Sequence, residues 1–93
     1  GRFRGSPLLR AKRGGLLRSA AIALGNHPDP AAAAALVRAM ADAEPVVRGA
    51  AAWALGRWRT IDSLAAMAHA ALEERRGVET DATVRAEIER ALA

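Results

Sequence analysis

Ala21-Ile22-Ala23-Leu24-Gly25 recurs 31 positions later as Ala52-Trp53-Ala54-Leu55-Gly56, and this recurrence decides the fold. Each copy is followed by a polar turn and then by an alanine-rich amphipathic run. A period of this length, built only from helical patterns, is typical of helical repeat arrays. One helix pair cannot bury its own apolar face, so the stacking of successive pairs supplies the core. We therefore predict an all-α protein, a short α-solenoid of about five to six helices.

Helix-start and helix-stop residues place the individual helices. The predicted start signals are Ser6-Pro7, Asp29-Pro30, Pro45, Thr60 and Thr80. The predicted stops are Gly14-Gly15, Gly25-Asn26, Gly56 and Gly77. Together they predict helices over residues 7–13, 15–24, 30–41, 45–56 and 61–75, and a last helix that ends at about residue 92.

These helices group into repeats within one domain over residues 1–93, which we expect to be the C-terminal fragment of a larger protein. A basic lead-in segment over 1–14 precedes repeat 1 (15–44), repeat 2 (45–77) and a capping helix (78–93). Val84-Arg85 repeats Val47-Arg48, which indicates that a third, incomplete repeat begins there. The last helix is polar enough to cap its end of the solenoid, whereas the first end is expected to adjoin another domain.

The composition excludes several functional classes. The chain has 93 residues, 52% of them hydrophobic, and no cysteine, so disulfides and thiolate-ligated metals or iron–sulfur clusters have no ligands here. His27 and His69 are far apart and lack clustered carboxylates, so we expect no metal site and no catalytic residue. No apolar run approaches the ~20 residues of a membrane span. We expect a cytoplasmic protein.

The distribution of charge along the chain is uneven. The net charge is +4, yet residues 1–18 alone hold six basic residues and no acid. Residues 19–59 carry a net +1 and residues 60–93 a net −3. A basic front end on a nearly neutral body is typical of proteins that bind a polyanion such as nucleic acid.

The basic cluster supplies the main candidate binding residues, Arg10, Lys12, Arg13 and Arg18, with Arg4 and Arg2 as additions from the chain start. Arginine offers a phosphate two parallel donors and lysine a point charge, so these residues are predicted to contact RNA phosphates. The alternative is a solvated helix face, which is what most charge runs form.

Arg48 follows Asp42 and Glu44 at the start of a helix. The interpretation we favour is a structural ion pair that fixes the turn between helices. A further phosphate contact is the functional alternative.

Two tryptophans have different surroundings. Trp53 lies in an apolar helical stretch and is predicted to belong to the core. Trp58 follows the predicted helix end between Arg57 and Arg59, a setting in which an indole can stack on an RNA base. Packing between helices is the interpretation we favour for Trp58, because a lone tryptophan usually packs.

Two sets of residues carry a family resemblance. Asp42-Ala43-Glu44-Pro45-Val46-Val47-Arg48, followed by Ala50-Ala51 and Ala54-Leu55-Gly56, resembles a HEAT-like repeat. Upstream, Arg4-Gly5-Ser6-Pro7, Arg10-Ala11-Lys12-Arg13, Gly15-Leu16-Leu17-Arg18 and Ala23-Leu24-Gly25-Asn26 resemble the C-terminal HEAT-like region of epoxyqueuosine reductase. The resemblance is clearest over residues 2–58.

That resemblance implies a function in tRNA modification. The parent enzyme, an oxidoreductase of queuosine biosynthesis, reduces epoxyqueuosine to queuosine in a tRNA anticodon loop. It uses cobalamin and two [4Fe-4S] clusters, which would belong to an N-terminal catalytic domain absent from this chain. The present segment would bind the tRNA anticodon stem-loop and would hold no cofactor itself. The alternative is a protein–protein interaction scaffold without a nucleic-acid role, which would expose an apolar groove rather than a basic one.

Overall fold

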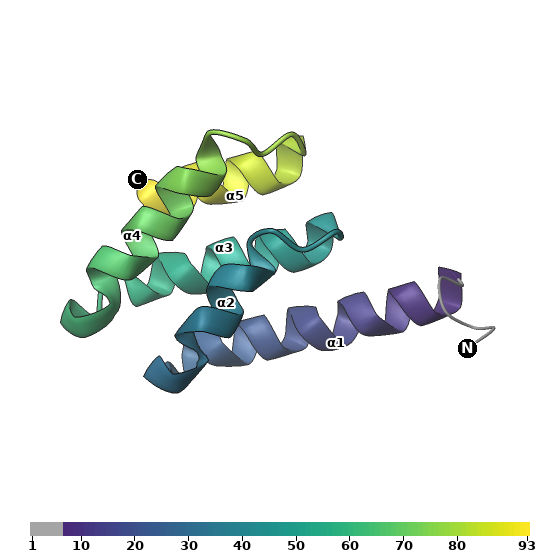
Figure 1. Ribbon diagram of the computed structural model, residues 1–93, viewed down its shortest axis with the longest axis horizontal. Helices are drawn as coiled ribbons and strands as arrows, with labels where there is room; N and C mark the ends of the chain where they lie inside the picture. The colour runs from purple at the N-terminus through teal and green to yellow at the C-terminus, as the bar shows by residue number, and fades with distance from the viewer. Residues whose placement is uncertain (1–6) are drawn as a thin grey trace.

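Five α-helices in two layers make up the part of the chain that the computed structural model describes, namely the backbone of residues 7–93 and the side chains of residues 12–93. The helices are α1 (Pro7–Asn26), α2 (Ala33–Ala39), α3 (Pro45–Trp58), α4 (Asp62–Arg76) and α5 (Ala82–Leu92), with a 3₁₀ turn at Pro30–Ala32. Figure 1 shows α1, α3 and α5 side by side and pointing in the same direction, with α2 and α4 returning across them. The predicted all-α solenoid is confirmed.

The core lies between the two layers. Alanines let the helices approach closely, and larger side chains fill the space between the layers. The large buried side chains are Leu36, Met40, Leu55, Trp58, Leu64, Leu72, Val84 and Ile88. Among residues 7–93, no helix combines the length and apolarity needed to cross a membrane.

The predicted break at Gly14-Gly15 is wrong, because α1 runs through both glycines as one helix of 20 residues. Gly14 is buried where α1 meets the start of α3, and the position of a Cβ there would lie 3.5 Å from Val46 Cγ1. A glycine inside a helix costs only about 1 kcal/mol relative to alanine, which packing against a neighbouring helix can offset. The basic lead-in therefore continues directly into the first repeat.

Helix starts follow the predicted signals in part. Asp29 accepts a hydrogen bond from the Ala31 N–H at 3.0 Å, as expected of a cap, and Pro45 opens α3. Thr60 is not a cap, because its hydroxyl donates to the Arg57 carbonyl at 2.8 Å. Asp81 caps α5 in place of the predicted Thr80, and its carboxylate accepts from the Val84 N–H at 2.9 Å.

Two glycines of α1 should respond oppositely to alanine. Nothing lies within 4 Å of a Cβ at Gly15, so Gly15→Ala should raise the free energy of unfolding by about 0.5–1 kcal/mol. A Cβ at Gly25 would lie 3.2 Å from the Ala54 backbone and against the Trp53 ring, so Gly25→Ala should be destabilising. Urea unfolding of both variants checks the pair. Equal effects of the two changes would contradict this packing of α1 on α3.

Candidate nucleic-acid interface

The predicted basic cluster does not form one surface on α1. Arg4 and the side chain of Arg10 lie outside the described part of the chain. Lys12, Arg13 and Arg18 are all exposed. At about 100° of rotation per residue, however, these three side chains leave α1 in directions more than about 90° apart. They therefore cannot all contact the same face of a ligand.

Arg13 is paired with a carboxylate. Its two terminal nitrogens donate to the two oxygens of Asp42, one of them at 3.2 Å, and Glu44 lies 4.0 Å away. The hydrogen bond from Arg13 lowers the pKa of Asp42 against the opposing effect of burial, and the pKa of Arg13 is raised in turn. The predicted phosphate contact at Arg13 is thus replaced by an intramolecular pair that joins α1 to the turn before α3.

Arg48 is buried rather than available to a phosphate. Its Nε and Nη2 donate to the two oxygens of Glu79 at 2.9 and 3.0 Å, and its Nη1 donates to the Asp42 carbonyl at 2.8 Å. Arg75 Nε donates to Glu79 as well, at 2.9 Å. The favoured structural role matches this geometry. The predicted carboxylate partners, Asp42 and Glu44, were wrong, because the partner comes from the next repeat, 31 residues away.

The same arrangement occurs twice along the solenoid, at Asp42 and at Glu79: an acidic residue in a turn accepts hydrogen bonds from arginines of other elements. We call this arrangement an arginine–acid joint. Asp42 accepts from the Glu44 N–H at 2.9 Å, and Glu79 accepts from the Asp81 N–H at 3.0 Å. Arg85 Nη1 donates to the Glu79 carbonyl just as Arg48 does to Asp42. Each acidic turn is therefore fixed by the arginine six residues later and by an arginine two helices earlier, Arg13 of α1 for Asp42 and Arg48 of α3 for Glu79. The recurrence of Val47-Arg48 as Val84-Arg85 in the sequence therefore corresponds to two structurally equivalent arginines, Arg48 and Arg85.

Acid should weaken the Glu79 joint. Burial by itself raises the pKa of Glu79, but hydrogen bonds from Arg48, the Asp81 N–H and Arg75 outweigh it and lower the pKa from 4.5 to about 2. A lowered native pKa means that the stabilisation is complete above pH 4.5 and is lost as the pH falls toward 2. The loss should be on the order of 3 kcal/mol. Urea unfolding between pH 6 and pH 2 measures it, and a stability unchanged across this range would contradict the joint.

Trp58 cannot stack on a base, because its side chain is fully buried between the layers. Its Nε1–H donates to the Leu24 carbonyl at the end of α1, at 2.8 Å. The packing interpretation is confirmed and the stacking platform is wrong. The flanking arginines have similar partners: Arg57 Nε donates to the Gly25 carbonyl at 3.1 Å and Arg59 Nη1 to the Ala91 carbonyl. Three successive residues thus bind α3 to the ends of α1 and α5.

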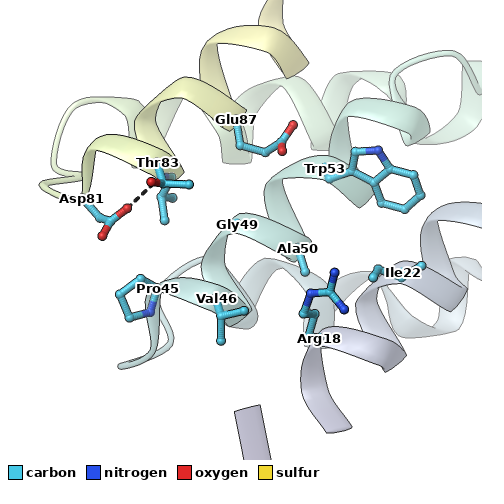
Figure 2. Close-up of a pocket in the computed structure, with 11 residues that line it drawn as sticks. Arg18, Ile22, Pro45, Val46, Gly49, Ala50, Trp53, Asp81, Thr83 and Glu87 are labelled. Carbon is cyan, nitrogen blue, oxygen red and sulfur yellow. Dashed lines mark hydrogen bonds between the residues drawn. The ribbon is translucent and has the colours of Figure 1, made fainter. Parts of the chain in front are cut away.

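A cleft of about 590 Å³ runs along the α1–α3–α5 layer. Arg18 enters it from α1, Thr83 and Glu87 line the α5 side, and small residues of α3 form part of its floor. The indole of Trp53 lies at one end of the cleft (Figure 2). This half-buried ring packs against the core rather than within it, so the core prediction is confirmed in part. Of the predicted site residues, Arg18 is the one that the described structure places in a cleft. Sequence reasoning missed Trp53, although its spacing of four residues from Arg57 on one helix face was visible.

The helices that border this cleft differ in charge. α1 and α3 carry six basic residues and no acid along their lengths. Among the described residues, six lysine and arginine side chains have no carboxylate within 4.0 Å: Lys12, Arg18, Arg38, Arg57, Arg59 and Arg85. Arg38 lies on α2, whereas the other five lie on α1, α3 or α5 or directly after α3. Positive charge is therefore concentrated on the α1–α3–α5 layer.

Comparison with known proteins gives one match. Residues 7–93 match the HEAT repeats, which covers every helix described above. No curated protein and no solved structure matches the chain. The two-layer stack with its repeated arginine–acid joints is thus accompanied by a family-level sequence match over most of the chain.

Proposed function

The chain belongs to the HEAT-repeat family, and on that premise we propose that its α1–α3–α5 layer binds the anticodon stem-loop of a tRNA. The observation that carries the proposal is the charge of two adjacent helices, because α1 and α3 hold six basic residues and no acid. Phosphate neutralisation by arginine and lysine supplies most of the affinity of such interfaces. Asp42 and Glu79 neutralise Arg13 and Arg48, so the contacts are assigned to cations of the layer without a carboxylate partner, such as Lys12 and Arg18.

More specifically, we propose that the chain is a module of an epoxyqueuosine reductase-like tRNA-modification enzyme in the cytoplasm. The sequence resemblance over residues 2–58 supports it. In such an enzyme the cobalamin and the two [4Fe-4S] clusters serve the reduction, and cysteine thiolates hold the clusters. This chain has no cysteine, and no three metal-binding side chains cluster among its described residues, so its residues do not fit the clusters. The chemistry is assigned to an N-terminal catalytic domain, and this chain to positioning of the RNA.

The test measures binding of the 93-residue chain to an anticodon stem-loop RNA by fluorescence anisotropy. With about four phosphate contacts, the affinity should fall roughly 100-fold between 50 and 200 mM salt. Arg18→Gln should weaken binding several-fold and reduce the salt slope by about one. Arg38→Gln is the matched control, because Arg38 is also exposed but lies on α2 in the other layer. Equal effects of the two variants would contradict the assigned face.

A folded chain that binds no RNA at low salt would favour the alternative, a protein–protein interaction scaffold. One specific observation supports that function. Leu16 is 73% exposed on α1, and Leu17 beside it is 37% exposed, on the helix that forms the first end of the stack. Exposed apolar side chains of this size at an end helix are suited to contact with another protein domain.

A further inference from the structure

A second hollow adjoins the cleft that Arg18 enters. It lies at the C-terminal ends of α1, α3 and α5, which are side by side in Figure 1. Its volume is about 920 Å³, and three arginines line it together with Thr60; they are Arg57, Arg59 and Arg90. We call this feature the arginine hollow. Its acidic side chain is Glu87, which is paired with Arg90 at 3.2 Å. The side chains of the hollow therefore carry an excess of positive charge.

Helix C-termini ordinarily repel anions, because their last carbonyls are unpaired and carry partial negative charge. Here three of these carbonyls already accept hydrogen bonds, those of Leu24, Gly25 and Ala91. The donors are Arg57 and Trp58 at the end of α3 and Arg59, the residue that follows it. The two arginines thus neutralise the helix ends and are held in place by them.

Both arginines keep donors for a ligand. Arg57 uses Nε, and Arg59 uses Nη1, for the carbonyl bonds described above. Within the described residues neither guanidinium has a carboxylate within 4.0 Å. A guanidinium has five N–H donors, so several remain on each side chain. Guanidinium groups held in place in this way match the oxygens of a phosphate.

The hollow is continuous with the Arg18 cleft. Trp53 and Glu87 line both features, and the Arg57 guanidinium lies over the Trp53 ring at 5.3 Å from its centre. Arg18, Trp53 and Arg57 therefore follow one another along the same layer. Alternating cations and an accessible aromatic ring are typical of surfaces that track a nucleic-acid backbone.

We propose that the arginine hollow binds a phosphodiester group, through Arg57, Arg59 and Arg90. The assignment of that phosphate to an RNA backbone rests on the function proposed above. The RNA would then extend from the Arg18 cleft past Trp53 to the ends of the three helices. None of these three arginines belongs to the basic cluster at the start of the chain.

The test uses the 93-residue chain with an amidated C-terminus, because the terminal carboxylate of Ala93 would otherwise border the hollow. Anisotropy with the anticodon stem-loop RNA compares Arg57→Gln/Arg90→Gln with the control Arg38→Gln. The double variant should lose at least 10-fold in affinity at 100 mM salt, and its salt slope should fall by about two. Affinity equal to that of the control, in a folded double variant, would overturn the proposal.

Two further measurements test the proposal if the double variant is unstable. If the double variant does not fold, Arg90→Gln alone is measured, because the Arg90 side chain is 66% exposed and its carboxylate partner is Glu87. It should lose several-fold in affinity relative to Arg38→Gln, and no loss would count against the hollow.

NMR signals of the arginine Nε–H groups are then followed as inorganic phosphate or RNA is added. The proposal expects shifts at Arg57, Arg59 and Arg90 with both ligands.

The outcomes separate this inference from the function on which it rests. RNA that shifts Arg18 but leaves the three hollow arginines unchanged retains the proposed function and overturns the hollow. If inorganic phosphate shifts the signals of the hollow arginines but the RNA does not bind, both the assignment of the phosphate to an RNA backbone and the proposed function are overturned. Binding of neither ligand overturns both proposals.

Discussion

Glu79→Ala is expected to lower the free energy of unfolding by about 3–5 kcal/mol, because it leaves the buried Arg48 without its carboxylate. The Glu79 side chain is fully buried, and two arginines and one backbone N–H donate to it. Domains of this size are stable by only about 5–15 kcal/mol, so the variant should unfold at much lower urea concentrations. Urea unfolding at pH 7, followed by circular dichroism, measures the loss.

Glu73→Ala is the matched control for this prediction. Glu73 also pairs with an arginine, Arg76, at 3.1 Å, but both side chains are nearly half exposed. Exposed pairs contribute about 0–1 kcal/mol, so the control should differ little from the unchanged chain. Similar losses of unfolding free energy in the two variants would show that burial does not distinguish the two ion pairs. Glu79→Ala should also reduce the loss of stability between pH 4.5 and 2, because the group that titrates is gone.

Trp58→Ala is expected to cost about 3–5 kcal/mol as well, since it removes the largest buried side chain between the layers. It also removes the donor to the Leu24 carbonyl, so that the ends of α1 and α3 lose a bond. Thermal and urea unfolding of this variant measure the effect.

Two replacements separate packing from hydrogen bonding at this position. Trp58→Phe keeps an aromatic ring but lacks the N–H, so it should cost less than the alanine variant and still leave the Leu24 carbonyl unpaired. Trp53→Phe is the comparison at a half-buried ring, where a smaller loss is expected. A Trp58→Ala variant as stable as Trp53→Phe would contradict the position of Trp58 in the core.

The candidate site was predictable in its charge and not in its partners. The six basic residues at the start of the chain are visible in the sequence, and so is the absence of acid among them. Which cations remain available depends on carboxylates that approach from the next repeat, such as Asp42 to Arg13 and Glu79 to Arg48. Those pairs join residues 29 and 31 positions apart, a separation at which local patterns carry no information about distance.

Errors at two helix boundaries changed the interpretation of nearby residues. A helix that ends at Gly56 would leave Trp58 outside the apolar stripe, whereas α3 extends to Trp58 and places it three residues after the buried Leu55. Glycine lowers helix propensity, but contacts with the neighbouring helix of the same layer offset that cost at Gly56, which faces Ala91 of α5, as they do at Gly14. Packing thus decided both boundaries.

The sequence by itself determined the all-α repeat, the cap at Asp29, the start of a helix at Pro45, and the concentration of positive charge near the first helix, because these depend on spacing and composition. Only the tertiary structure decided which arginines are used internally, which tryptophan is buried, and that Arg57, Arg59 and Arg90 line one hollow. The reason is that stacking of parallel helices brings together side chains from different repeats, and their contacts depend on how the layers pack.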